Sequence, residues 1–405
     1  MTEAQASPFK RIVWPLAVAQ TLLWAGLYYL FPVLLGAWER DFGWSKAELT
    51  GGLTAALLLA AVLAPFAGRA IDAGRGRGLF IGSTMLGAVM LALLALVSEL
   101  WQFYLVWLGL GIAMAGALYE PCFALITRHM GRRAREAITL VTLVAGFAGT
   151  IAFPTGHALD EALGWRGVAL VFVGLIALIA LPLNLYAVSQ AQAAVIDPEP
   201  PETPAAYTGE PVDVTHLKAF WLLGLAFAMM ALGHGALITH LLPLLEERAI
   251  HGEAAVLAAA MIGPMQVMGR LAMLAVEKHV AASMIAVGSF LAMAIAALAL
   301  LGIAAAPLMI VVFVLFQGAG YGVTNILRPV LVAQLLGRRK FGIVAGMLAV
   351  PHLTVFALAP TIAGLIWGLG GYDTVIILAA AAALIGLVAL VLAARAAPLT
   401  DRPSG

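Results

Sequence analysis

The sequence predicts an all-α integral membrane protein with twelve transmembrane helices in two pseudo-symmetric six-helix bundles. Three observations support this fold class: the composition, a series of long apolar runs, and one long polar break near the middle of the chain. Of the 405 residues, 63% are hydrophobic and 11% are charged, whereas soluble domains contain about 45–50% apolar and about 25% charged residues. A soluble chain of this size could not shield so much apolar surface from water.

Twelve apolar runs are long enough to cross a bilayer, which takes roughly 20 helical residues. The first run follows Lys10 and Arg11 and is too long for a signal peptide, so we expect it to stay in the mature protein. Ser45 and Glu48 predict a capping box at the start of the second span. In chain order, the predicted spans are 12–35, 49–67, 79–97, 103–127, 138–156, 168–186, 220–245, 254–271, 280–303, 308–335, 343–369 and 375–394.

The polar break covers residues 187–219 and is rich in proline and acidic residues, which favours an extended cytoplasmic linker. It separates a six-helix bundle at 1–186 from a second bundle with a short tail at 220–405. Short motifs recur in both halves, which predicts a duplicated unit. The pairs are Gly68-Arg69 with Gly269-Arg270, Glu120-Pro121 with Arg328-Pro329, and Gly131-Arg132-Arg133 with Gly337-Arg338-Arg339.

The positive charges predict the orientation of the chain. Of the 22 Lys and Arg residues, the outer segments carry only Arg40, Lys46, Arg166 and Arg248, while Arg328 falls inside a span. The others lie in inner segments, which is a strong positive-inside bias. We therefore expect a multi-pass protein of the cell inner (plasma) membrane with both termini cytoplasmic.

Several function classes have little support. The formal net charge of +1 gives no basic field for nucleic acid. The single Cys122 permits no intramolecular disulfide. The sequence contains no His-x3-His pair, so it gives no indication of a metal site. No phosphate-binding loop or nucleophile-base motif is present, which argues against an ATP-driven pump or an intramembrane enzyme. We expect no cofactor.

The inner loop after the second span carries a cluster of glycine, acid and arginine. Its residues permit close backbone approach and supply countercharges for the carboxylate, so they can latch one conformation. The alternative is that the arginines only anchor the topology. The predicted gating residues are Gly68, Asp72, Gly74, Arg75 and Arg77.

This Gly-x-x-x-Asp-x-Gly-Arg loop resembles the loop motif of the major facilitator superfamily, and two six-helix halves joined by a cytoplasmic linker resemble the same superfamily. The resemblance implies a major facilitator fold whose first, fourth, seventh and tenth spans line a central cavity. Thr239-His240-Leu-Leu-Pro243 and Arg328-Pro329 resemble bacterial members related to monocarboxylate and oxalate porters.

Two ionisable residues lie deep in apolar runs, Glu120 in the fourth span and Arg328 in the tenth. A charge at the bilayer centre costs about 2.5–3.5 kcal/mol on insertion scales, so such residues usually face a bundle interior or water. Both precede a proline at repeat-equivalent positions, so we expect them at corresponding places in opposite halves. The alternative to a transport site is a static ion pair. Glu120 can titrate and is the candidate for proton coupling, whereas Arg328 keeps its charge.

Polar and aromatic residues at helical spacing predict the substrate-binding faces. In the tenth span, Gln317, Tyr321, Asn325 and Arg328 are spaced to share one face. In the first span, Gln20, Trp24 and Tyr28 form a stripe that either lines the cavity or packs at the membrane interface. Tyr119, next to Glu120, is a further candidate.

Three histidines complete the set of candidates. His234 and His240 lie six residues apart, about 120° around a helix, so we do not expect them to share one ligand. His240 and His352 are proton-responsive or substrate-donating candidates, and the alternative for each is a buried neutral ring bonded to a carbonyl.

These features predict a secondary transporter that works by alternating access and moves protons with a small organic anion of the monocarboxylate type. One alternative is a proton antiporter that exports an amphipathic or toxic compound. Another is a non-transporting receptor or assembly protein with the same fold. The expected partners are a small-molecule substrate, protons and the lipid bilayer, with no nucleic acid, and the protein is expected to be a monomer.

Overall fold

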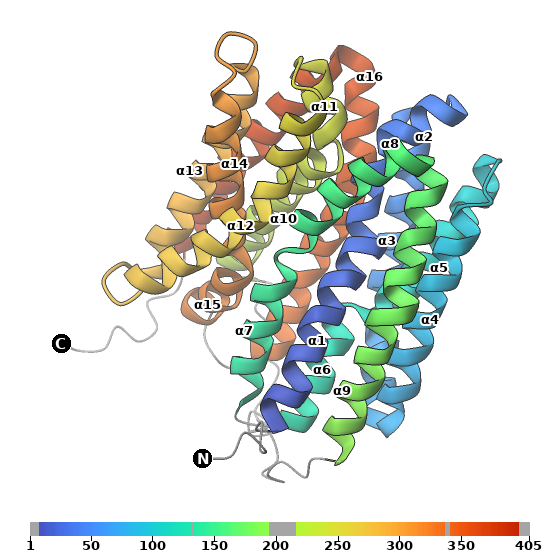
Figure 1. The fold of residues 1–405 in the computed structure, drawn as a ribbon. Helices are drawn as coiled ribbons and strands as arrows, with labels where there is room; N and C mark the ends of the chain where they lie inside the picture. The colour runs from blue at the N-terminus through green and yellow to red at the C-terminus, as the bar shows by residue number, and fades with distance from the viewer. Residues whose placement is uncertain (1–7, 131–132, 194–215, 337–340, 397–405) are drawn as a thin grey trace, which may run out of the picture. The chain divides into compact units, whose positions relative to one another are not determined.

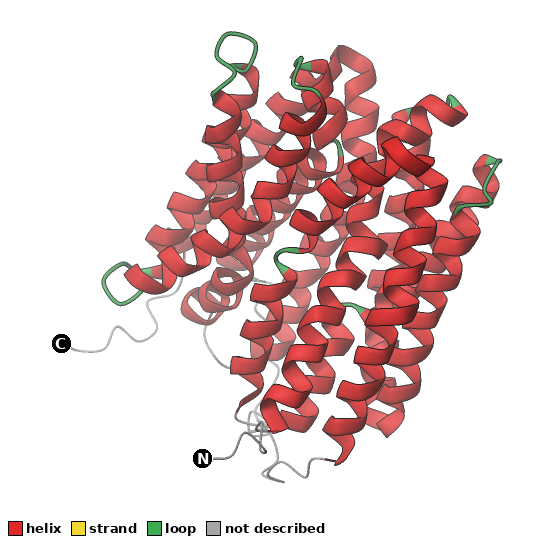
Figure 2. Cartoon of the chain, in the orientation of Figure 1, coloured by secondary structure: helices red, strands yellow, loops and turns green. Residues whose placement is uncertain are grey.

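The computed structural model describes residues 8–130, 133–193, 216–336 and 341–396. Throughout these ranges the regular structure is helical, with short connections and no strand (Figures 1 and 2). The chain divides into two compact units, Met1–Thr203 and Pro204–Gly405, and the boundary falls inside the predicted linker.

The number of candidate membrane-crossing helices in the structure differs from the number of spans predicted from the sequence. Nine helices in the described ranges are long and apolar enough to cross a membrane, or ten if the bent pair Met309–Gly322 and Ile326–Leu336 forms one span. Two of the nine, Glu136–Gln192 and Met347–Ala396, contain 57 and 50 residues, although a single crossing needs roughly 20. Non-helical glycines interrupt them where the sequence predicts outer loops, at Gly164 and at Gly370 and Gly371. The count of twelve spans stays a prediction.

The described part of the N-terminal unit consists of helices with three π-helical segments, of which η1 contains a predicted cavity-lining residue and η2 contains predicted gating residues. Its capping box is confirmed, because Ser45 N donates to Glu48 Oε2 at 2.8 Å and Glu48 N donates to Ser45 Oγ at 3.2 Å. The elements are α1 (Pro8–Trp24), η1 (Ala25–Tyr29), α2 (Leu30–Phe42), α3 (Lys46–Ala70), η2 (Ile71–Arg75), α4 (Gly76–Leu94), α5 (Leu100–Ala117), α6 (Tyr119–Met130), α7 (Ala134–Ala145), α8 (Ala148–Leu175), η4 (Ile176–Ala180) and α9 (Leu181–Ala193).

The C-terminal unit contains α10 (Lys218–Thr239), α11 (Leu241–Glu247), α12 (Gly252–Val276), α13 (Ala282–Leu301), α14 (Met309–Gly322), α15 (Thr324–Leu336) and α16 (Phe341–Ala396). The helices extend into the predicted linker from both sides, to Ala193 and from Lys218. The middle of that linker lies outside the described residues. So do Gly131, Arg132 and the segment 337–340, which include parts of one predicted repeat motif.

The tenth predicted span is not one straight helix. Its four polar residues are divided between α14, with Gln317 and Tyr321, and α15, with Asn325 and Arg328, so a shared face stays a prediction. α14 ends at Gly322, and the following helix is inclined to it by 42°. Gly318, Gly320 and Gly322 lower the helix propensity here. Side chains from other helices donate hydrogen bonds to the carbonyls at the break. Ser289 Oγ donates to Gly320 O, and Arg270 Nε donates to Gly322 O at 2.8 Å.

The fourth predicted span is broken as well. Its helix α5 ends at Ala117, Leu118 is extended at φ −86° and ψ −153°, and α6 begins at Tyr119. Gln20 Nε2 of α1 donates to Ala117 O at 2.7 Å, so a side chain again bonds a carbonyl at the break. The two spans predicted to carry Glu120 and Arg328 are therefore both interrupted within a few residues of those charges.

Each unit brings two helices into backbone contact through glycine. A Cβ added at Gly111 of α5 would collide with the backbone of Ala56 in α3, and one added at Gly318 of α14 would collide with Ile262 and Met265 in α12. Small residues allow such close packing in membranes. The pair α3 and α5 lies in the second and fourth predicted spans of the first half, and α12 and α14 lie in the second and fourth of the second half. Both pairs pack closely through a glycine, which supports the predicted duplication.

A second feature recurs at the predicted outer ends. Asp41, at the end of α2, accepts hydrogen bonds from Trp165 Nε1 at 2.8 Å and from Arg166 at 2.9 Å. Glu247, at the end of α11, accepts from Trp367 Nε1 at 3.1 Å and from the Tyr372 backbone N–H at 3.1 Å. In each unit, a carboxylate after the first span thus fixes a tryptophan near the turn between the last two spans.

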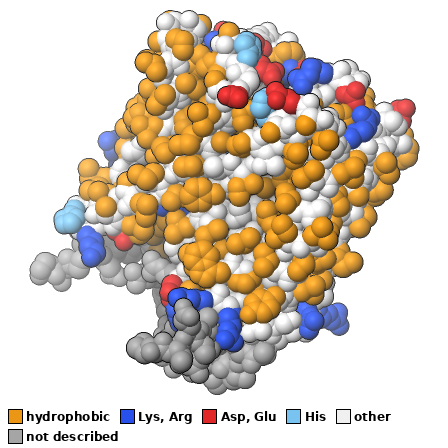
Figure 3. Space-filling model, in the orientation of Figure 1, with side chains coloured by type: hydrophobic (Ala, Val, Ile, Leu, Met, Phe, Trp, Pro, Cys, Tyr) orange, Lys and Arg blue, Asp and Glu red, His pale blue; other side chains and the backbone are white. Residues whose placement is uncertain are grey.

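The molecular surface has the character expected in a bilayer. Hydrophobic side chains cover most of the face in Figure 3, and charged side chains gather toward the helix ends. Large aliphatic residues such as Leu96, Leu178 and Leu369 are 76%, 78% and 84% exposed. In lipid, such exposure is favourable, because the surrounding solvent is itself apolar.

Candidate functional site

The N-terminal unit brings three predicted substrate residues together at the break in the fourth span. Trp24 of α1 lies beside Tyr28 of η1, with ring centroids 5.5 Å apart, and beside Tyr119 of α6 at 4.8 Å. Gln20, one turn before Trp24, is fully buried and bonds the Ala117 carbonyl. Its Oε1 and the Trp24 Nε1 have no hydrogen-bond partner among the described residues. A donor and an acceptor are thus unused close to the break.

Glu120 lies in the first turn of α6 and is exposed. A new helix starts at Tyr119, so its dipole favours a negative charge at this position. This local structure explains how a carboxylate is tolerated within a predicted span.

The C-terminal unit assembles a second group of predicted residues from α10 and α14. His234 is 4% exposed, and its Nδ1 lies 3.1 Å from Nε2 of the fully buried Gln317. Its ring stacks on Tyr321, with centroids 3.3 Å apart and planes 5° from parallel. Gln317 Oε1 has no partner among the described residues. The sequence did not predict the His234–Tyr321 stack, because periodicity within one helix does not reveal contacts with another.

His352 and Arg328 extend this group. His352 of α16 is 6% exposed, and its Nδ1 lies 3.1 Å from Phe227 O. It is close enough to Arg328 and to His234 to interact electrostatically with both. Arg328 itself is half-buried on α15. Asn325 also belongs to α15, but its side chain lies outside the described part of the structure.

His240 belongs to a different environment. It is fully buried after the end of α10, with Nδ1 3.2 Å from the Tyr372 hydroxyl and Nε2 3.0 Å from Pro360 O. A carbonyl only accepts, so Nε2 carries a hydrogen, and in the neutral ring Nδ1 accepts from the tyrosine. Both nitrogens are used within the fold, which favours the structural alternative for this histidine.

The predicted gating loop connects α3 to α4 through η2. Gly74 has φ +79° and ψ 5°, a left-handed conformation that favours glycine. Arg75 and Arg77 are exposed, and Gly68 is half-buried. The side chain of Asp72 lies outside the described residues, so the latch stays a prediction.

The described acidic residues of the C-terminal unit share one kind of position. Its described acidic residues, Glu246, Glu247, Glu253, Glu277 and Asp373, lie at or near helix ends or turns. The group around Arg328 offers an arginine, two histidines, an amide and a tyrosine. Such a set supplies positive charge and hydrogen-bond donors, which suit an anion.

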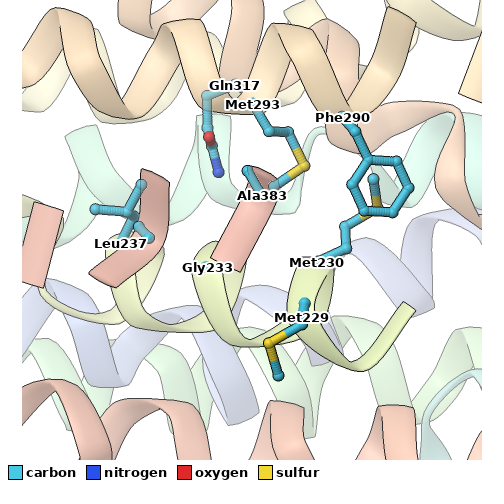
Figure 4. Close-up of a pocket in the computed structure, with 9 residues that line it drawn as sticks. Met229, Met230, Gly233, Leu237, Phe290, Met293, Gln317 and Ala383 are labelled. Atoms are coloured by element: carbon cyan, nitrogen blue, oxygen red, sulfur yellow. The ribbon is translucent and has the colours of Figure 1, made fainter. Parts of the chain in front are cut away.

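Sequence reasoning missed Arg270 and Ser289, which bond the carbonyls of the bent span. Arg270 was assigned only to the positive inner segments, yet it is 8% exposed. The available signal was the apolar stretch 271–276 that follows it, which continues the run beyond the predicted end at residue 271. Figure 4 shows another feature found only in three dimensions: Gln317 points into a narrow pocket lined by Met229, Met230, Met293 and Phe290.

Within the described ranges, no group of three or more His, Cys, Asp or Glu residues is placed to hold a metal ion.

Comparisons with known proteins agree with this architecture. The family model of the Major Facilitator Superfamily matches residues 16–281. A bacterial homologue of the human lysosomal transporter Spinster, inward-facing and occupied, has a TM-score of 0.72 at 17% identity, with 98% of this chain and 99% of that chain covered. Its unoccupied form has a TM-score of 0.68 at 18% identity, with 97% and 96% covered.

The nucleoside transporter NupG has a TM-score of 0.71 at 14% identity, with 96% of this chain and 99% of that chain covered. At such identities the likeness concerns the fold. No functionally curated sequence matches the chain.

Proposed function

Because the chain belongs to the major facilitator superfamily, we propose that it is a proton-coupled secondary transporter that moves a small organic anion by alternating access. Membership makes it a multi-span membrane transporter rather than an enzyme, in agreement with the sequence prediction. The narrower resemblance to monocarboxylate porters stays a prediction.

The single observation that carries the anion assignment is the cationic, donor-rich group in the C-terminal unit. Arg328 lies within electrostatic range of His352, and Gln317 and Tyr321 contact His234. An organic anion supplies the negative charge that such a group favours, and a carboxylate can take two parallel hydrogen bonds from a guanidinium.

Glu120 is the proposed proton carrier. It is the acid that the sequence places deep in a span, and it is exposed in the first turn of α6. A carboxylate in such a position changes its proton affinity when water is removed around it or a neighbouring charge changes. Alternating exposure of Glu120 would thereby couple proton movement to transport.

The positive-inside charge pattern supports an inner-membrane location with both termini cytoplasmic. We propose a monomer as the working unit. The second candidate function is proton-linked export of an amphipathic cation, which the combination of Glu120 with the nearby rings of Trp24 and Tyr119 favours.

A thermal-shift screen on the purified protein tests the proposal. Lactate, benzoate, sulfate, phosphate and tetraphenylphosphonium are compared on the wild type, Arg328→Ala, Arg328→Lys and Arg395→Ala, where Arg395 is an exposed control near the end of α16. A bound ligand raises the melting temperature with concentration. We expect stabilisation by a carboxylate that is lost in Arg328→Ala and kept in Arg395→Ala. Stabilisation by the cation alone would contradict the anion assignment and favour export.

A further inference from the structure

A continuous row of aromatic rings crosses the N-terminal unit and extends well beyond the three predicted residues. Neighbouring ring centroids are 6.1, 5.1, 5.5, 4.8 and 5.0 Å apart along the row. These spacings fall in the range of favourable aromatic contacts. In spatial order, the aromatic row consists of Phe153, Tyr29, Tyr28, Trp24, Tyr119 and Phe123.

The row differs from the other aromatic cluster of the same unit. That cluster, which we call the outer cluster, includes Phe31, Trp38, Phe103 and Trp107. All four side chains are 0% exposed, so their rings are used entirely in packing. In the aromatic row, four rings are only half-buried: Trp24, Tyr29, Tyr119 and Phe123. These four rings retain surface that the fold does not cover.

The accessible part of the row lies at the break in the fourth span. Tyr119 and Phe123 stack nearly parallel, 15° apart, on the first turns of α6, and Glu120 lies between them in sequence. A helix break, an exposed carboxylate and uncovered rings thus occur together.

We propose that the aromatic row is a ring-stacking surface and that the transported anion is therefore an aromatic carboxylate. This inference rests on the proposed function, which supplies the anion. An aryl group presents two flat faces that can stack on Tyr119 or Trp24. An aliphatic acid of the same charge offers no such face.

The test compares benzoate with cyclohexanecarboxylate, which has the same charge and nearly the same size but no π-system. Dissociation constants are measured by concentration-dependent thermal shift on the wild type, Tyr119→Leu, Tyr119→Phe and Trp24→Leu. Phe103→Leu in the outer cluster is the matched control for the loss of a ring. We expect the wild type to prefer benzoate by roughly 3- to 10-fold, the scale of one aromatic contact. The preference should disappear in Tyr119→Leu or Trp24→Leu and remain in Tyr119→Phe and Phe103→Leu.

Equal affinity of the wild type for the two acids would overturn this inference and leave anion transport intact. A benzoate preference that survives both Tyr119→Leu and Trp24→Leu would overturn the assignment to the aromatic row. If neither acid binds and benzylamine does, the proposed function fails together with the inference.

Discussion

The imidazole of His234 lies flat on the ring of Tyr321, with centroids 3.3 Å apart, while its Nδ1 faces Gln317 Nε2 at 3.1 Å. An amide nitrogen only donates, so with this amide orientation Nδ1 is the acceptor and the ring carries its hydrogen on Nε2. This contact joins α10 to α14 beside the bend that leads to Arg328. It is the part of the candidate site most readily probed by substitution.

His234→Phe should preserve the stack on Tyr321 and remove the hydrogen bond to Gln317. The buried amide would then be unpaired, which lowers the free energy of unfolding by about 1–3 kcal/mol. The double variant His234→Phe/Gln317→Leu replaces both partners by apolar groups and should recover most of that loss. Thermal melting in detergent measures both, and additive losses in the double variant would contradict the pairing.

Arg270→Met should loosen the bend between α14 and α15, because it removes the donor to Gly322 O. We expect faster amide hydrogen exchange in the segment 318–327 and a loss of about 1–3 kcal/mol in unfolding free energy. Arg270→Lys keeps a donor and should show a smaller effect on exchange. Unchanged exchange in Arg270→Met would show that the arginine does not hold the bend.

His240→Leu should lower stability without affecting ligand affinity. The substitution leaves the Tyr372 hydroxyl and the Pro360 carbonyl without this partner, at about 1–3 kcal/mol. The melting temperature and the benzoate dissociation constant are measured on the same preparation. A loss of benzoate affinity at an unchanged melting temperature would show instead that His240 belongs to the substrate site.

Gly74→Ala should destabilise the gating loop, because an L-residue at φ +79° costs about 1–2 kcal/mol. The control is Gly78→Ala in α4, where an added Cβ meets no atom within 4 Å. That change should stabilise the helix by about 0.5–1 kcal/mol. The two melting temperatures should therefore move in opposite directions, and equal shifts would refute the assigned role of the glycine.

The sequence predicts the helical fold well, because apolar runs report directly on the bilayer. The orientation inferred from the positive charges stays a prediction. The capping box at Ser45 is confirmed for a similar reason, since its three-residue spacing is local. The break in the tenth span could not be predicted with equal certainty. Its glycines were visible, but the donors from Ser289 and Arg270 lie on other helices.

The candidate site shows the same difference between local sequence patterns, which could be predicted, and contacts between helices, which could not. Trp24, Tyr28 and Tyr119 were singled out from their positions, and the structure brings them into contact. Tyr29, Phe123 and Phe153 become part of the same row only through tertiary packing. His240 shows the reverse case, because its polar character suggested a ligand role, while its two bonds within the fold are invisible in the sequence.

Proton-driven anion uptake into proteoliposomes tests the central claim most directly. Radiolabelled benzoate and lactate are supplied under an acid-outside pH gradient to the wild type, Glu120→Gln and Arg328→Ala, and uptake by protein-free liposomes is subtracted. We predict saturable, gradient-driven accumulation of at least one anion by the wild type, its loss in Arg328→Ala, and anion exchange that no longer responds to the gradient in Glu120→Gln. Unchanged gradient-driven accumulation in Glu120→Gln would contradict the proton-coupling assignment, and the absence of carrier-dependent uptake of both anions would contradict the claim itself.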